Sequence, residues 1–212
     1  MPATAPTTRP ATGARAGRAA QRATTRARLY EATVAEFMSQ GFAATEVAVV
    51  AERVGLSRGA FYVHFAGKDE VLRELLVVEE QHIADTARAA LDDTSDVAEL
   101  FLAVVTAVLT AEQRLGRGLV RDLCAAQFRP EFAAQLAVED HPLGVMLVEE
   151  VAARAPGTDP VDLTMVFLTG MFGLLAVDDS GDADRRRRLT RLIESVTSPL
   201  RDAALIRKKR RP

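Results

Sequence analysis

The sequence predicts an all-α fold of about nine helices. The alternation of apolar and polar residues that is typical of strands is nearly absent, whereas long runs rich in Ala, Leu, Glu and Arg dominate. The 212 residues are enough to bury a real core in one or two small domains. Several apolar runs begin at a capping residue or end at a glycine, so the elements can be justified in chain order.

The first segment, 1–24, is rich in Ala, Thr, Pro, Gly and Arg and contains no acidic residue. Such a segment buries too little apolar surface to order itself, so we expect a disordered basic arm. Its arginines are expected either to stay solvated or to contact a phosphate backbone or a minor groove. The first ordered helix is expected from about Thr25 to Gln40, where Gly41 ends it.

Two short helices separated by a tight turn are predicted next, over 45–54 and 57–65. Thr45 and Ser57 are suitable N-caps because their hydroxyls accept the free N–H groups of a first helical turn. Gly55 follows the first helix directly and suits a left-handed conformation.

The second of these helices has two different sides. Phe61 and Phe65 lie four residues apart and are expected to pack on the first helix. The other side carries residues that are unusual for a core: Arg58, Gly59, Tyr62, Val63 and His64. This pattern indicates an exposed reading helix of a helix–turn–helix rather than an ordinary buried helix pair.

The stretch resembles the N-terminal domain of the tetracycline-repressor (TetR) family. The departures are mild, with valine at 50 and 54 and leucine at 56, and none removes a hydrogen-bonding group. The residues that carry the resemblance are Gly41, Phe42, Thr45, Val47, Val50, Ala51, Val54, Gly55, Leu56, Ser57, Gly59, Tyr62, His64, Phe65, Lys68 and Val71.

The expected partner of this head is double-stranded DNA. Arg58 is the long donor at the start of the reading helix, so we expect it to read a base, most simply a guanine. Ala60 and Val63 are small and apolar enough to contact a thymine methyl group. The resemblance implies phosphate contacts for Thr45, Tyr62, His64 and Lys68. The predicted DNA-binding set is Thr45, Ser57, Arg58, Gly59, Ala60, Tyr62, Val63, His64 and Lys68.

The remainder of the chain is predicted to form a larger helical body. A long helix from Lys68 to about Leu91 would connect the head to this body. Asp96 and Glu99 form a plausible capping box. Further helices are expected over 116–127, from Pro130, and up to about Arg154 after an interruption at His141–Pro142.

The last two helices are predicted over 160–177 and 184–204, the first of them beginning after Asp159. The segment 160–177 is almost wholly apolar, which favours burial on all sides. The resemblance implies that both helices form a four-helix interface between two copies of the chain. The run Arg185–Arg188 is expected to be a solvated helix start.

The net charge of −2 hides an asymmetry. Residues 1–68 carry nine basic and four acidic residues, whereas 69–206 carry thirteen basic and twenty-five acidic residues. The predicted domains are a disordered arm over 1–24, a DNA-binding head over 25–68, a ligand-binding and dimerisation body over 69–206, and a basic tail over 207–212.

Other classes of protein find little support. The single cysteine, Cys124, cannot form an internal disulfide, which fits a buried thiol in a reducing cytoplasm. The three histidines form no metal-binding or catalytic pattern, so we expect no cofactor, no metal and no enzymatic activity. No run of 18 residues is free of charge, and we expect no membrane span.

We therefore expect a homodimeric repressor that a small-molecule effector releases from a palindromic operator. The alternatives are an activator of the same fold, a non-specific DNA binder that uses its basic tails, and an all-α carrier or enzyme. The effector pocket is expected among Phe101, Cys124, Gln127, Phe128, Phe132, His141, Met146, Met165 and Phe167.

Overall fold

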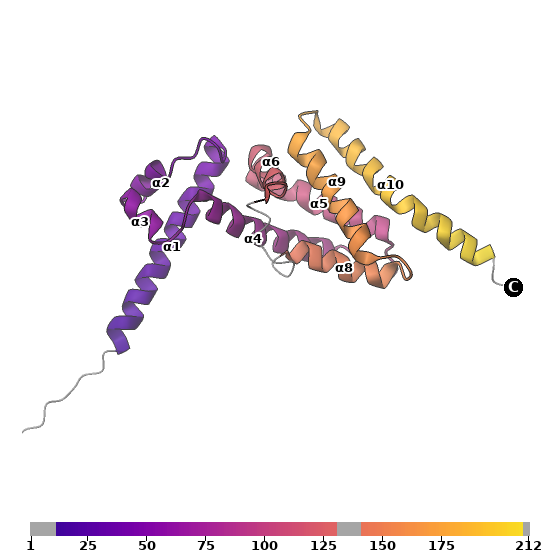
Figure 1. Cartoon of the computed structure of the whole chain (residues 1–212), viewed down its shortest axis with the longest axis horizontal. Helices are drawn as coiled ribbons and strands as arrows, with labels where there is room; N and C mark the ends of the chain where they lie inside the picture. The colour runs from indigo at the N-terminus through magenta and orange to yellow at the C-terminus, as the bar shows by residue number, and fades with distance from the viewer. Residues whose placement is uncertain (1–11, 131–140, 210–212) are drawn as a thin grey trace, which may run out of the picture.

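The computed structural model describes residues 12–130 and 141–209, and the side chains of 16–130 and 141–200. These residues form nine α-helices and no strand, which confirms the all-α prediction. Figure 1 shows α1 (Thr12–Gln40), α2 (Val47–Arg53) and α3 (Arg58–Tyr62) as a head at one end of the molecule. The helix α4 (Lys68–Ala89) leads from the head into the body.

The helix α1 begins well before the expected residue. The predicted disorder of 1–24 is wrong for residues 12–24, which continue the helix without a break, while residues 1–11 lie outside the described part of the chain. Alanine is the strongest helix former, and this stretch is rich in it. A helix already formed by packing farther along also extends at little cost, because only its nucleation is expensive.

The two reading helices are shorter than predicted. The N-cap of α2 is Glu46 rather than Thr45, and α3 ends at Tyr62 rather than near Phe65. Thr45 is 3% exposed, and its hydroxyl donates to the carbonyl of Gly41 at 2.9 Å. Its hydroxyl is therefore used to close the turn after α1.

The body comprises α5 (Val97–Leu115), α6 (Arg117–Ala126), α8 (Pro142–Arg154), α9 (Pro160–Val177) and α10 (Asp182–Lys209). The capping box of Asp96 and Glu99 is present, with both hydrogen bonds formed. Asp159 caps α9 as predicted, and α8 begins at Pro142. The helix expected from Pro130 falls on residues outside the described part.

Within a single chain, the helix α9 is buried on one side only, so its burial on all sides stays a prediction that depends on a second copy of the chain. Phe167 and Met171 face the core of the same chain and are fully buried. Val161, Met165 and Val166 lie on the opposite side and are 54–57% exposed. Within the described residues, α9 is also the one helix long and apolar enough to cross a membrane.

The helix α10 packs closely on α9. A Cβ atom at Gly170 would lie only 2.7 Å from Cδ1 of Leu192, so this glycine allows the two helices to approach. The expected solvation of Arg185 is wrong, since this residue is 4% exposed and both oxygens of Glu112 accept from its guanidinium at 2.6 and 2.5 Å. This buried ion pair joins α10 to α5.

Candidate DNA-binding head and effector cavity

The short helix α3 is held in place by its own first turn and by its buried face. The Oγ of Ser57 accepts from the N–H of Ala60 at 3.2 Å, which confirms the predicted cap. Gly55 adopts φ +75°, a conformation that a residue with a Cβ rarely adopts. Phe61 and Phe65 are fully buried, with ring centroids 5.5 Å apart.

The opposite side of α3 faces solvent. Tyr62 is 47% and Val63 60% exposed, and Arg58 and Gly59 are exposed as well. The Arg58 guanidinium lies 5.8 Å from the centre of the Tyr62 ring. The structure therefore brings most of the predicted DNA-binding residues to one surface, with Ser57 exposed beside them and Ala60 and His64 half-buried.

Lys68 and Thr45 are exceptions within the predicted set. The ammonium of Lys68 donates to the carbonyls of Phe42, Ala43 and Thr45 at 2.7, 3.0 and 3.0 Å. These three bonds use every hydrogen of the ammonium group. Both polar groups bind the turn between α1 and α2, so the phosphate contacts that the family resemblance implied for Thr45 and Lys68 stay a prediction.

Three arginines of α1 hold the head together, and the sequence analysis assigned no such role to them. The guanidinium of Arg22 donates to the Val63 carbonyl at 3.2 Å, and that of Arg28 to the Val54 carbonyl at 3.0 Å. Arg26 binds Glu74 through two hydrogen bonds and stacks on the ring of Phe65. The basic first helix is thus joined to both reading helices and to α4.

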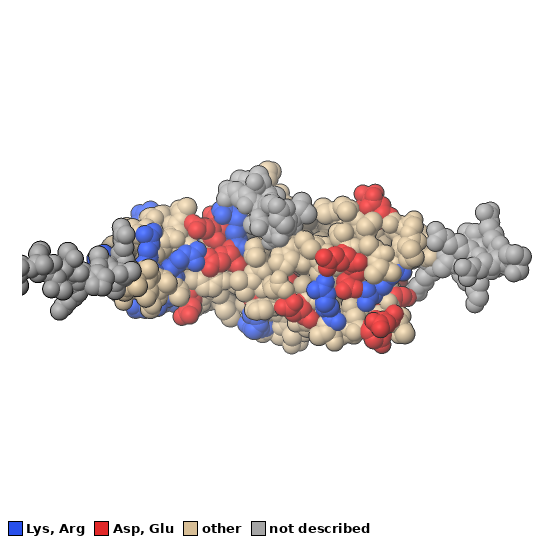
Figure 2. Space-filling view, turned by 90° about the horizontal axis from the view of Figure 1, so that it is seen from below, with Lys and Arg blue, Asp and Glu red and all other residues tan. Residues whose placement is uncertain are grey.

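Charge is unevenly distributed along the molecule. In the view of Figure 2, basic side chains predominate at the head end, whereas the body shows acidic and basic side chains together. A positive head on an acidic body favours approach of the head to a polyanion.

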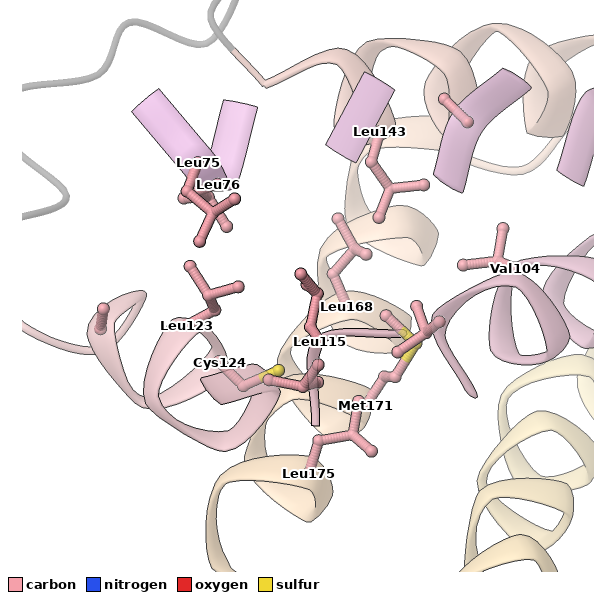
Figure 3. Close-up of a cluster of buried hydrophobic side chains, with 14 of the residues drawn as sticks. Leu75, Leu76, Val104, Leu115, Leu123, Cys124, Leu143, Leu168, Met171 and Leu175 are labelled. Atoms are coloured by element: carbon pink, nitrogen blue, oxygen red, sulfur yellow. The ribbon is translucent and has the colours of Figure 1, made fainter. Parts of the chain in front are cut away.

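The body contains a cavity of about 40 Å³ between α4, α5, α6, α8 and α9. Figure 3 shows some of its apolar side chains converging from separate helices, among them Leu76, Leu123 and Leu143. Two acidic residues of α4, Glu79 and Glu80, also line it. The other lining residues are Ile83, Val108, Ala111, Leu115, Val120, Cys124, Gln127 and Phe172.

The predicted pocket residues divide into three groups. Cys124 and Gln127 line the cavity, and Nδ1 of His141 lies 3.2 Å from Oε1 of Glu80, which also lines it. Five of the others do not line this cavity. Phe101 and Phe167 stack on each other in the core, with centroids 3.9 Å apart, and Met146 is also buried away from the cavity. Phe128 and Met165 are more than half exposed, and Phe132 lies outside the described residues.

Glu79 and Glu80 were not predicted as cavity residues, although the sequence contains a signal for them. Glu79 and Glu80 fall three and four residues after Leu76, and four and three residues before Ile83, in register with the apolar residues of α4. Both glutamates are 4% exposed. An acidic residue in the register of a buried helix face marks an internal polar site.

Head and body are connected through the same helices that line the cavity. From α6, Oδ2 of Asp122 accepts from the N–H of Phe42 at 3.0 Å. Just beyond α6, Arg129 pairs with Asp69 of α4 at 3.2 Å. The helix α6 thus carries two cavity-lining residues, Leu123 and Cys124, next to Asp122, which binds the head.

A short exposed helix, fixed by buried aromatic residues behind a glycine turn, defines a helix–turn–helix DNA-binding protein. Residues 29–75 match the family model described as bacterial regulatory proteins, tetR family. The head of this chain is therefore a helix–turn–helix domain of the TetR family of transcriptional regulators. Within the described residues, no cluster of three or more potential metal ligands occurs.

The curated relatives match this chain over short stretches only. The transcriptional regulator TtgR of Pseudomonas putida is 44% identical over 51 residues, which are 24% of each chain. The chain spans less than two thirds of the length of the curated relatives it matches.

Solved structures extend the likeness to the fold of most of the chain. The Thermus thermophilus repressor FadR, in complex with lauroyl-CoA, has a TM-score of 0.63 at 19% identity, over 82% of this chain and 92% of that one. Salmonella enterica GusR has a TM-score of 0.62 at 22% identity, over 84% and 96%. The helical body therefore has the fold of known TetR-family proteins.

Proposed function

We propose that this protein is a cytoplasmic, homodimeric repressor that a small-molecule effector releases from a palindromic operator. The observation that carries this proposal is the double role of α4 and α6. Both helices line the cavity, and both hold the head through the contacts of Glu74 with Arg26 and of Asp122 with Phe42. An effector that separates these helices changes the position of the head.

The dimer is proposed to form through 160–177 and 184–204. The exposed apolar side of α9, with Val161, Met165 and Val166, is a surface that a second copy would cover. Two heads related by a two-fold axis read half-sites about one helical turn, ~34–36 Å, apart or somewhat more. The exposed apolar side thus supports dimerisation, with a membrane-bound monomer as the outcome that would contradict it.

Within each head, α3 is proposed to enter the major groove. Arg58 reads a base there, Ala60 and Val63 contact a thymine methyl group, and Tyr62, His64 and Ser57 contact the backbone. Gly59 lets the helix approach closely. Release requires that the effector bind the displaced state more tightly than the DNA-binding state. The complex of FadR with lauroyl-CoA supports the presence of an effector in this fold.

The test uses the DNA that flanks the coding region of this protein. We expect protection of an inverted repeat there, a preference of ~10³-fold or more over random DNA at physiological salt, and repression of a reporter placed behind it. Equal affinity for random DNA would indicate a non-specific binder. Increased reporter transcription would indicate an activator. A monomer at every concentration would contradict the dimer.

A further inference from the structure

Three glutamates are buried in the described part of the body, and they differ in their partners. Glu79 accepts two hydrogen bonds from the guanidinium of Arg114, at 3.1 and 2.5 Å. Glu112 is bound by Arg185 in the same way. Glu80 has no such partner, since its Oε1 contacts the amide of Gln127 at 3.1 Å and Nδ1 of His141 at 3.2 Å.

The second oxygen of Glu80 is the exceptional atom. Oε2 is buried and has no hydrogen-bond partner among the described residues. Among those residues, its ion-pair partner is the imidazole of His141, which is charged only when protonated, and no lysine or arginine pairs with it. A buried carboxylate costs several kcal/mol unless a cation or enough hydrogen bonds compensate for its lost hydration. A positive group that reached Glu80 would therefore gain a strong, poorly screened interaction.

The surroundings of Glu80 decide what kind of cation fits. The cavity next to it is lined mainly by hydrocarbon, including Leu76, Leu123, Leu143 and Phe172. A metal ion would require several ligands in one cluster; Glu79 is already bound by Arg114, and the described residues contain no group of three or more side chains that could hold a metal. An organic cation with an apolar arm matches both features, since its arm contacts the hydrocarbon walls and its charge approaches the carboxylate.

We propose that the effector is a small organic cation and that Glu80 is the residue that recognises its charge. This inference rests on the proposed function, because it assigns the chemistry of the effector to the cavity between head-holding helices. The cavity is small, about 40 Å³, so such a cation pushes α4 and α6 apart when it binds. The cation therefore favours the displaced state of the head over the DNA-binding state.

Binding is tested by calorimetry on the full chain without DNA, using a charged and a neutral probe of the same shape. Phenyltrimethylammonium carries the positive charge, and tert-butylbenzene replaces its nitrogen with carbon. We expect the wild-type protein to bind the cation at least about tenfold more tightly than the isostere, which corresponds to ~1.4 kcal/mol. Equal binding of both probes, or no binding of the cation, overturns the proposal without any mutant.

The variant Glu80→Gln keeps the shape of the side chain and removes its charge. We expect it to weaken cation binding about tenfold or more and to leave binding of the isostere unchanged within about twofold. Asp85→Asn is the matched control, because it removes one exposed charge from the same helix and lies away from the cavity. Thermal melts establish that both variants fold. Unchanged cation binding in folded Glu80→Gln overturns the proposal.

The two proposals fail in different ways. A protein that binds the cation through Glu80 but stays on its operator contradicts effector-driven release and leaves the recognition by Glu80 intact. A protein that reads its operator but takes up no cation contradicts only the role of Glu80.

Discussion

At the scale of single residues, the hydrogen bonds that a side chain already makes decide whether it is available to bind DNA. Arg58 and Lys68 are both basic residues of the same motif. The guanidinium of Arg58 lies exposed over Tyr62, whereas the ammonium of Lys68 is enclosed by three carbonyls. The sequence shows only that both are cations. The division of roles between base reading and head stability therefore follows from geometry that the motif alone does not specify.

Arg58→Ala should reduce the affinity for the operator by about 1–3 kcal/mol and relax the preference at one base pair. The reason is that Arg58 is the long donor at the start of the exposed α3 helix. Binding to a set of single-base operator variants measures both effects. An equal loss on operator and on random DNA would assign Arg58 to the phosphate backbone instead.

Lys68→Ala should lower the free energy of unfolding of the head by about 1–3 kcal/mol, because the three carbonyls of the turn between α1 and α2 lose their donor. Chemical denaturation monitored by circular dichroism provides the measurement. Arg58→Ala serves as the control, since it also removes a head cation but no such bonds. If Lys68→Ala leaves the stability unchanged and flattens the salt dependence of DNA binding, Lys68 is a phosphate contact after all.

Cys124 should be unreactive in the folded protein. Burial, reinforced by the nearby carboxylate of Glu112, raises the pKa of its thiol to about 12. Because the thiolate is the reactive form, almost none is present near pH 8. Alkylation by iodoacetamide at pH 8 should be slow until denaturant is added, and it should accelerate only at strongly alkaline pH. Rapid labelling of the native protein would show that the cavity wall opens readily.

At the scale of helices, the sequence predicted the helix ends that a capping side chain or a glycine fixes. The capping box at Asp96, the cap at Asp159 and the glycine turn at Gly55 were all correct, because each depends on local residues. The prediction for Arg185 was wrong because its environment depends on a distant partner, whereas the predicted start of α1 was wrong because an alanine-rich segment extends a helix that is already nucleated. Arg185 meets Glu112 from 73 positions away, and no local pattern distinguishes it from its solvated neighbours.

Arg185→Ala should destabilise the body by about 3–5 kcal/mol, because it leaves the carboxylate of Glu112 buried without its partner. Arg186→Ala is the matched control, since that side chain is exposed and its loss should change stability by less than ~0.5 kcal/mol. Thermal unfolding compares the two. Equal melting temperatures would mean that water or Arg117 compensates for the lost ion pair.

At the scale of the whole molecule, the exposed side of α9 connects fold and assembly. Met165→Asp should shift the protein toward monomers and weaken operator binding, because it places a charge in the proposed interface between copies. Sedimentation measures the change in mass. Val78→Asp, which alters an exposed apolar residue of α4, should remain dimeric. A dimeric Met165→Asp variant would place the interface elsewhere.

The two parts of the candidate site were predictable to different degrees. The exposed face of α3 follows from residues within one short stretch, so most of it could be read from sequence. The cavity is lined by five helices, and its walls depend on how these helices cross. Bulky residues such as Phe101 and Met165 were therefore predicted to line the pocket. The packing instead places Phe101 in the core and Met165 on the surface.

The length of α1 has a practical consequence. Its 29 residues span about 44 Å, and its carboxyl end lies beside the hydrogen bond between Phe42 and Asp122. A rotation of about 5° around that end would move the far end by roughly 4 Å. A slight tilt of this helix is therefore amplified at its amino end. Spin labels at Gly17 in the two copies of the proposed dimer would report such a tilt as a change in the distance between the labels.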